Sequence, residues 1–109
     1  MTEFYWNSYE GCVFEIRCDG HAVGSPEVCA AISCICHTLV EQLQKTKAII
    51  LSLALEKGYF HIVFCDAKPF FEFAETAFEL LAKNYPWYCR KAEKEPLDFN
   101  FDFDIINKP

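Results

Sequence analysis

Apolar side chains occupy every second position of one early stretch of the chain, and this row consists of Cys12, Phe14, Ile16 and Cys18. A period of two residues predicts a β-strand on which all four share one face. An aromatic run at positions 4–6 precedes it, and turn-forming residues occupy positions 7–8 and 10–11. We therefore expect the two stretches to pair as a hairpin.

Two later stretches, residues 48–55 and 59–65, are almost continuously apolar. The turn-forming residues 56–58 join them, which predicts a second hairpin. Strands that are apolar on both faces are typical of the centre of a sheet, so we expect both strands there. Residues 97–105 alternate between apolar and polar, mostly acidic, side chains, which predicts one further strand with an aromatic face and an acidic face.

Two stretches have the period of an amphipathic helix. The first begins at Pro26, with Ser25 as its N-cap, and runs to about Gln44. Its apolar stripe consists of Val28, Ile32, Ile35, Leu39 and Leu43. The second begins near Pro69 and ends at the Asn-Tyr-Pro sequence of residues 84–86. Its predicted buried face consists of Phe70, Phe73, Ala74, Ala77, Phe78 and Leu81.

The predicted elements follow one another as hairpin, helix, hairpin, helix and strand. This order predicts an α+β fold, in which two helices pack on a mostly antiparallel sheet of about five to six strands. With 109 residues, 52% of them hydrophobic, the chain is expected to form one domain over residues 1–109.

The net charge of −6 argues against nucleic acid as a partner, because phosphates require a basic surface, and favours a basic polypeptide instead. Neither a basic leader nor an uninterrupted apolar stretch of membrane-spanning length occurs. We therefore expect no membrane association and a cytoplasmic location.

Seven cysteines are an odd number, which favours reduced thiols over a disulfide framework. Zinc binding is the competing interpretation, yet no two cysteines have the Cys-x-x-Cys spacing typical of structural zinc sites. We therefore expect neither a metal nor another cofactor. Cys34 and Cys36 are expected to point apart on their helix, and His37 and His61 to be packing or surface residues.

His21 and Cys29 lie at the two ends of the loop that leads into the first helix. A cysteine acts as a nucleophile only as the thiolate, and both a helix N-terminus and a nearby imidazole favour that form. The backbone N–H groups of Glu27, Val28 and Cys29 are candidates for stabilising an oxyanion. A cysteine in the first turn of a helix is more often structural than catalytic, so the pair alone leaves both interpretations open.

Four further residues are candidates for supporting this site. Ser33 lies one turn after Cys29 on the same helix face, where its hydroxyl would orient the site or bond to the Cys29 carbonyl. Gly20 and Gly24 allow the backbone angles that the loop needs, and the small side chain of Ala30 leaves room for close backbone packing.

The segments Gly20–Ala22 and Cys29–Ser33, set between a strand and a helix, resemble the ribosomal-processing cysteine protease family, called Prp. The pattern of that family is Gly-His-Ala, a glycine-containing loop, then Asp, two apolar residues, Cys-Ala and a stretch of small residues ending in Ser. Residues 84–88 are similar to the family as well, since its members commonly carry Tyr-Pro after the second helix. The resemblance covers about residues 12–91, so the predicted strand 97–105 falls outside it.

The resemblance implies a Cys/His endopeptidase, with Cys29 as the nucleophile and His21 as the base. It is that of a diverged member, because Pro26 replaces the Asp of the pattern and the loop between His21 and Cys29 is short. The family removes a short N-terminal extension from large-subunit ribosomal protein number twenty-seven, and some members process phage structural proteins. The implied partners are a basic polypeptide substrate and a second copy of the chain, in a homodimer.

A second hypothesis comes from another class of protein. The chain would be a noncatalytic interaction module of the same fold, which binds a basic peptide through its acidic or aromatic surface.

Overall fold

The computed structural model describes residues 1–22 and 24–92. Within them, seven elements follow one another: β1 (Thr2–Tyr9), β2 (Val13–Asp19), α1 (Pro26–Lys45), β3 (Ile49–Glu56), β4 (Tyr59–Cys65), α2 (Lys68–Asn84) and β5 (Cys89–Lys91). The strands form one sheet in the order β3-β4-β2-β1-β5. Only the β1–β5 pair is parallel in this described sheet, so the predicted α+β fold with a mostly antiparallel sheet is confirmed.

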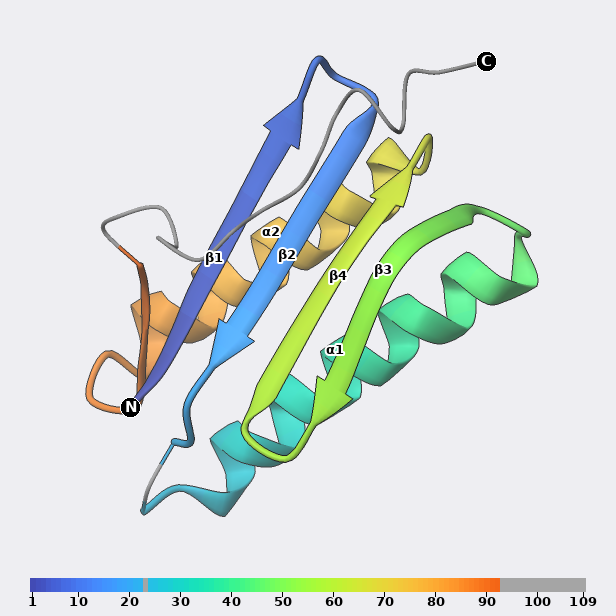
Figure 1. The fold of residues 1–109 in the computed structure, drawn as a ribbon. Helices are drawn as coiled ribbons and strands as arrows, with labels where there is room; N and C mark the ends of the chain where they lie inside the picture. Colours follow the sequence, from blue (N-terminus) through green and yellow to red (C-terminus); the bar gives the residue numbers. More distant parts are fainter. Residues whose placement is uncertain (23, 93–109) are drawn as a thin grey trace.

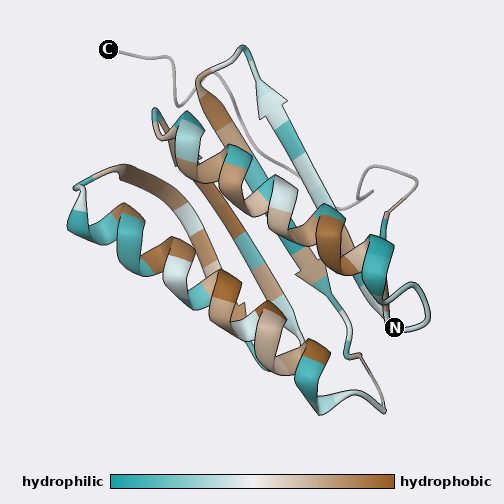
Figure 2. Cartoon of the chain, turned by 180° about the vertical axis from the view of Figure 1, so that it is seen from behind, coloured by the Kyte–Doolittle hydropathy of each residue, from teal (hydrophilic) through white to brown (hydrophobic). Residues whose placement is uncertain are grey.

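Both helices cover the same face of the sheet, as the opposite views in Figures 1 and 2 show. The core between the two layers contains the alternating residues Phe14, Ile16 and Cys18 of β2. Cys12 lies before the strand and is exposed, so its predicted place on that buried face is wrong. The expected hairpin is confirmed, since β1 pairs with β2 from Glu3 to Tyr9.

The first helix begins at Pro26 as predicted and ends one residue beyond the predicted end, at Lys45. Ser25 caps it, because the Ser25 side chain accepts a hydrogen bond from the Val28 N–H group. Cys34 is exposed and Cys36 is buried, which confirms that the two thiols point apart.

The second helix buries a different face from the predicted one at its start. Phe73 is 67% exposed, whereas Phe71 is buried. Phe71 stacks on Phe14 of β2 with ring centroids 4.7 Å apart. Phenylalanines at adjacent positions of one helix turn offer two possible apolar faces, and only contact with the sheet selects between them.

The expectation that both strands of the second hairpin are central is correct for β4 and wrong for β3. β4 pairs with β2 and β3, whereas β3 is an edge strand. The exposed aliphatic side chains of β3 are Ile49, Leu51, Leu53 and Leu55, and the strand appears largely brown in Figure 2. Both strands have the same apolar pattern, and the pattern does not tell which of them pairs with β2.

A short strand, β5, pairs with β1 in parallel and was not predicted from the sequence. Its three residues are too few for an alternation pattern. The predicted strand 97–105 lies outside the described residues. Within the described part of the chain, no helix has both the length and the apolar character needed to cross a membrane.

Candidate active site

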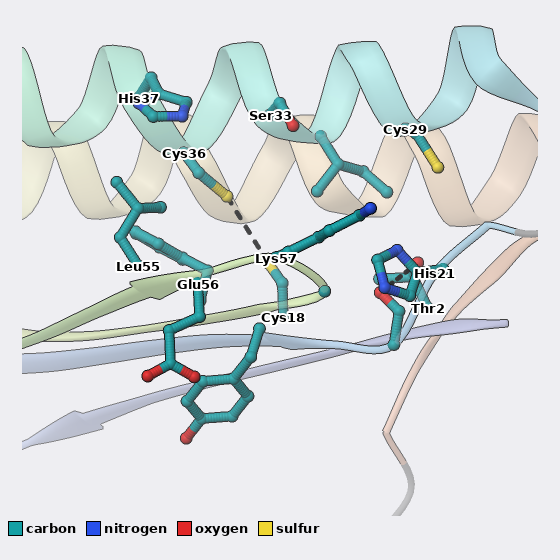
Figure 3. A pocket seen from close by; sticks show the side chains of 15 residues that line it. Thr2, Cys18, His21, Cys29, Ser33, Cys36, His37, Leu55, Glu56 and Lys57 are labelled. Carbon is teal, nitrogen blue, oxygen red and sulfur yellow. Dashed lines mark hydrogen bonds between the residues drawn. The ribbon is translucent and has the colours of Figure 1, made fainter.

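A pocket of about 620 Å³ lies between α1 and the β3–β4 turn, and it contains both His21 and Cys29 in its wall (Figure 3). The α1 side of the wall consists of Cys29, Ile32, Ser33, Cys36 and His37. The opposite side consists of Leu55, Glu56, Lys57, Gly58, Tyr59 and Phe60, and Thr2, Cys18, Gly20 and His21 complete the lining.

Gly20 positions His21 at the end of β2. Its backbone φ is +97°, and a Cβ atom at this position would overlap the carbonyl oxygen of Met1. The Gly20 N–H donates to the Gly58 carbonyl at 2.9 Å, and the Thr2 hydroxyl donates to the Gly20 carbonyl at 3.2 Å. Only glycine combines this φ with such a close backbone approach, so the predicted need for Gly20 has a structural basis.

Gly58 provides the space that the His21 imidazole occupies. A Cβ atom at Gly58 would overlap His21 Nε2 and lie 2.8 Å from His21 Cε1. The sequence showed the 56–58 turn but gave no sign that it adjoins His21. The antiparallel register of β2 and β4, which pairs Asp19 with Tyr59, brings the two together.

Cys29 lies in the first turn of α1, and its thiol donates a hydrogen bond to the Ala22 carbonyl at 3.6 Å. Ala22 directly follows His21, so this bond directs the thiol toward the histidine loop. Figure 3 shows the Cys29 sulfur and the His21 imidazole facing the same end of the pocket. Among the described side chains, no hydrogen bond joins the two.

The expectation for the oxyanion donors is wrong at two of the three backbone groups. The Val28 N–H donates to the Ser25 hydroxyl at 3.3 Å, and the Cys29 N–H donates to the Ser25 carbonyl at 3.2 Å. Both bonds follow from the cap and the first helical turn, which occupy these donors as the helix forms.

The other predicted supporting residues differ in position. Ser33 lines the pocket and is exposed, and its hydroxyl makes no hydrogen bond within the described part of the chain. Gly24 has a φ of +90° but is not part of the pocket lining, and Ala30 is exposed outside the pocket. The supporting roles of these three residues stay predictions.

Cys18 of β2 and Cys36 of α1 also line the pocket, and their sulfurs lie 4.0 Å apart. Burial raises the pKa of the Cys18 thiol, and the neighbouring Cys36 thiol raises it further. Cys18 is therefore a protonated thiol at neutral pH. The sequence did not reveal this pair, because its members belong to two elements that meet only in the packed core.

A second polar cluster lies on the sheet face away from the helices, where Glu15 alternates with the core residues of β2. Glu15 is 0% exposed; its carboxylate accepts a hydrogen bond from the Tyr9 hydroxyl at 2.8 Å and pairs with His61 Nε2 at 2.7 Å. Burial, followed by the contact with Glu15, raises the pKa of Tyr9. His61 was expected to be a packing or surface residue, and it lies half-buried in this bonded cluster.

In the described ranges 1–22 and 24–92, no three His, Cys, Asp or Glu side chains converge as metal ligands would.

Comparison with known family models finds no match, and comparison with curated proteins finds none either. Solved structures do match. The essential ribosomal processing protease Prp from S. aureus, in complex with a covalently linked product peptide, superposes with a TM-score of 0.73 at 20% sequence identity. The alignment covers 86% of this chain and 100% of that one.

The resemblance to Prp is confirmed at the level of the fold. A second structure of S. aureus Prp, with a substrate peptide, matches over 86% of this chain and 100% of the other, with a TM-score of 0.72 at 17% identity. SMU.848 from Streptococcus mutans is 25% identical over 84% of this chain and 91% of its own, with a TM-score of 0.67. The Prp fold therefore carries the pocket that contains His21 and Cys29.

Proposed function

We propose that this chain is a cysteine endopeptidase, with Cys29 as the nucleophile and His21 as the general base. The observation that carries the proposal is the shared pocket, in which a helix-start thiol and a histidine face one end. Hydrogen bonds between catalytic groups are often absent before substrate binds and form in the complex. The proposal therefore requires the His21 side chain to move toward Cys29 when substrate binds.

The reaction follows from the two groups. His21 accepts the Cys29 proton, and the thiolate attacks the carbonyl carbon of the scissile amide to form a carbon–sulfur bond. The carbon–nitrogen bond then breaks as His21 protonates the leaving amine. Water hydrolyses the resulting thioester, which releases the second product and restores the thiol.

The shape of the pocket supports a polypeptide substrate. Along α1 the lining extends from Cys29 to His37. Eight residues at about 1.5 Å rise correspond to about 12 Å, the length of about four residues of extended peptide. The two S. aureus Prp structures were solved with a product peptide and a substrate peptide, which agrees with such a ligand.

The net charge of −6 favours a basic substrate. We propose that the cleaved segment is a short N-terminal extension or propeptide of a ribosomal protein or a phage structural protein. The homodimer and the cytoplasmic location stay predictions.

Limiting labelling with iodoacetamide, mapped by mass spectrometry between pH 5 and 9, tests the pair. We expect Cys29 to react below pH 7 before Cys12 and Cys34, although those two thiols are more exposed. His21→Ala should remove this preference. His37→Ala is the matched control, because His37 lines the same pocket without adjoining the Cys29 end, and it should leave the preference intact. Equal labelling of Cys29 and Cys34 would contradict the proposal.

The missing hydrogen bond between His21 and Cys29 favours a second candidate function, a noncatalytic peptide-binding module. That function predicts that a basic, aromatic-containing peptide binds with unchanged affinity to Cys29→Ala and is never cleaved by the wild type. Fluorescence anisotropy and mass spectrometry of the same mixture distinguish the two functions.

A further inference from the structure

Cys18 and Cys36 are the two described thiols whose sulfurs contact each other across the layers of the fold. Cys18 belongs to β2 and Cys36 to α1, and they lie 18 positions apart in the sequence. Their residues are 4% and 3% exposed, so each thiol lies inside the core. Figure 3 shows the pair among the side chains that line the pocket, joined by the dashed line.

We propose that Cys18 and Cys36 form a modification site, at which a peroxide converts the two thiols into an intramolecular disulfide. The sulfurs are 4.0 Å apart, and a disulfide bond measures about 2.05 Å. Bond formation therefore requires rotation of the two side chains about their Cα–Cβ bonds and a small shift between β2 and α1.

A small oxidant has a route to the pair, because both residues line the pocket of about 620 Å³. Their low exposure excludes a large oxidant such as a protein disulfide. Thiols buried in this way react slowly, since the thiolate is the reactive form. The oxidation is therefore expected to be slower than that of the exposed Cys34.

The reaction is balanced with hydrogen peroxide as the oxidant. One sulfur attacks a peroxide oxygen, the oxygen–oxygen bond breaks, and the released hydroxide takes the thiol proton to become water, which leaves a sulfenic acid. The second sulfur attacks the sulfenic sulfur, the sulfur–oxygen bond breaks, and the hydroxide leaves with the second thiol proton as water. The two thiols together lose two electrons and two protons, and one peroxide becomes two waters.

The segment closed by this bond contains both members of the candidate active site, His21 and Cys29. The disulfide would therefore tie the strand that leads to His21 covalently to the helix that carries Cys29. Closing a loop of this length restricts the unfolded chain and raises the Tm by roughly 10 °C. This inference does not depend on whether Cys29 is catalytic.

Treatment of the folded protein with excess hydrogen peroxide, followed by peptide mapping without reductant, tests the site. We expect a Cys18–Cys36 cross-link, a loss of two hydrogen atoms, and full reversal by dithiothreitol. Cys36→Ala should abolish the cross-link. Cys34→Ala, the same substitution two positions away on the same helix, should retain it.

The same mapping in Cys29→Ala tests whether Cys29, the more accessible thiol of the pocket, is oxidised first and then exchanges with the pair. We expect the Cys18–Cys36 cross-link to persist in this variant. Sulfinic acids at Cys18 or Cys36 without a cross-link, or a disulfide that includes Cys29, would overturn the proposal. Thermal unfolding of the oxidised and reduced wild-type protein provides a test that requires no core substitution. Cross-linked protein with an unchanged or lower Tm would contradict the proposed geometry.

Discussion

Two histidines differ in how firmly they are held: His61 lies in β4 on the sheet face away from the helices, and His21 lies in the loop after β2. His61 bonds to a fully buried Glu15 at 2.7 Å, and Tyr9 bonds to the same carboxylate at 2.8 Å. His21 is exposed in a pocket, and no hydrogen bond joins it to Cys29 within the described residues. A buried charge must be paired for the fold to be stable, whereas the hydrogen bonds of catalytic groups often tighten only when substrate binds. The first cluster is thus suited to stability, whereas the second leaves His21 free of the contact with Cys29 that the proposed chemistry would require in the substrate complex.

The largest expected effect is the loss of peptide cleavage when Cys29 is replaced, with little change in stability. Cys29→Ala should lower peptide cleavage by about 10⁴-fold or more, because it removes the nucleophile. Its free energy of unfolding should change by less than about 1 kcal/mol, since Cys29 is only half-buried. Cleavage assays and urea unfolding measure the two quantities. Cys34→Ala is the control, and cleavage that survives in Cys29→Ala would disprove the assignment.

At the cluster of Glu15, Tyr9 and His61 we expect the reverse, a loss of stability with little change in cleavage. Glu15→Ala should lower the free energy of unfolding by about 3 kcal/mol, because it removes the buried carboxylate to which His61 and Tyr9 bond. Cleavage by the folded fraction should change little. Urea unfolding checks this, with Glu72→Ala on the exposed surface of α2 as the control. A loss of cleavage without a loss of stability would contradict the assignment of this cluster to stability.

Two glycine substitutions test whether the position of His21 matters for cleavage. Gly58→Ala and Gly11→Ala both place a side chain at positive φ, +78° and +73°, which costs about 1 kcal/mol each. Only the new Cβ at position 58 meets His21, since none lies within 4 Å at position 11. We expect both variants to lose similar stability, and Gly58→Ala alone to lose cleavage, by about 10- to 100-fold. Equal cleavage in both variants would show that the position of His21 is unimportant.

The smallest effect concerns pH. The pKa of Tyr9 in the folded protein is raised, chiefly by burial, above the ordinary value of about 10. Its contribution to stability is therefore fully present below about pH 10 and is lost as the pH rises beyond that value. Tyr9→Phe should be less stable than the wild type by about 1 kcal/mol at pH 8, and the difference should shrink toward pH 11.

Urea midpoints of the two proteins at pH 8, 9, 10 and 11 provide this measurement. The buried thiols of Cys18 and Cys89, whose pKa values are also raised, are present in both proteins and cancel in the difference. A difference that stays constant over this range would show that Tyr9 does not titrate differently in the folded state.

Much of the fold could be predicted from local pattern. The period-two row of β2, the N-cap Ser25 and the turn before β4 are short-range signals, and each indicated an element that the structure contains. The edge position of β3 and the burial of Phe71 could not be predicted, because each depends on which partner a strand or helix meets. Local β-propensity does not tell an edge strand from a central one. Local sequence likewise does not tell which phenylalanine of the helix turn meets the sheet.

In the candidate site, too, some features follow from local sequence and others from tertiary contacts. The sequence by itself determined that a histidine follows a strand, that a cysteine begins a capped helix, and that glycine separates them, because these features depend on neighbours along the chain. Only the tertiary structure decided that the 56–58 turn adjoins His21, that Cys18 meets Cys36, and that Glu15 joins Tyr9 and His61. The physical reason is that strand register and layer packing set these long-range distances, and neither is specified by the spacing of residues in one segment.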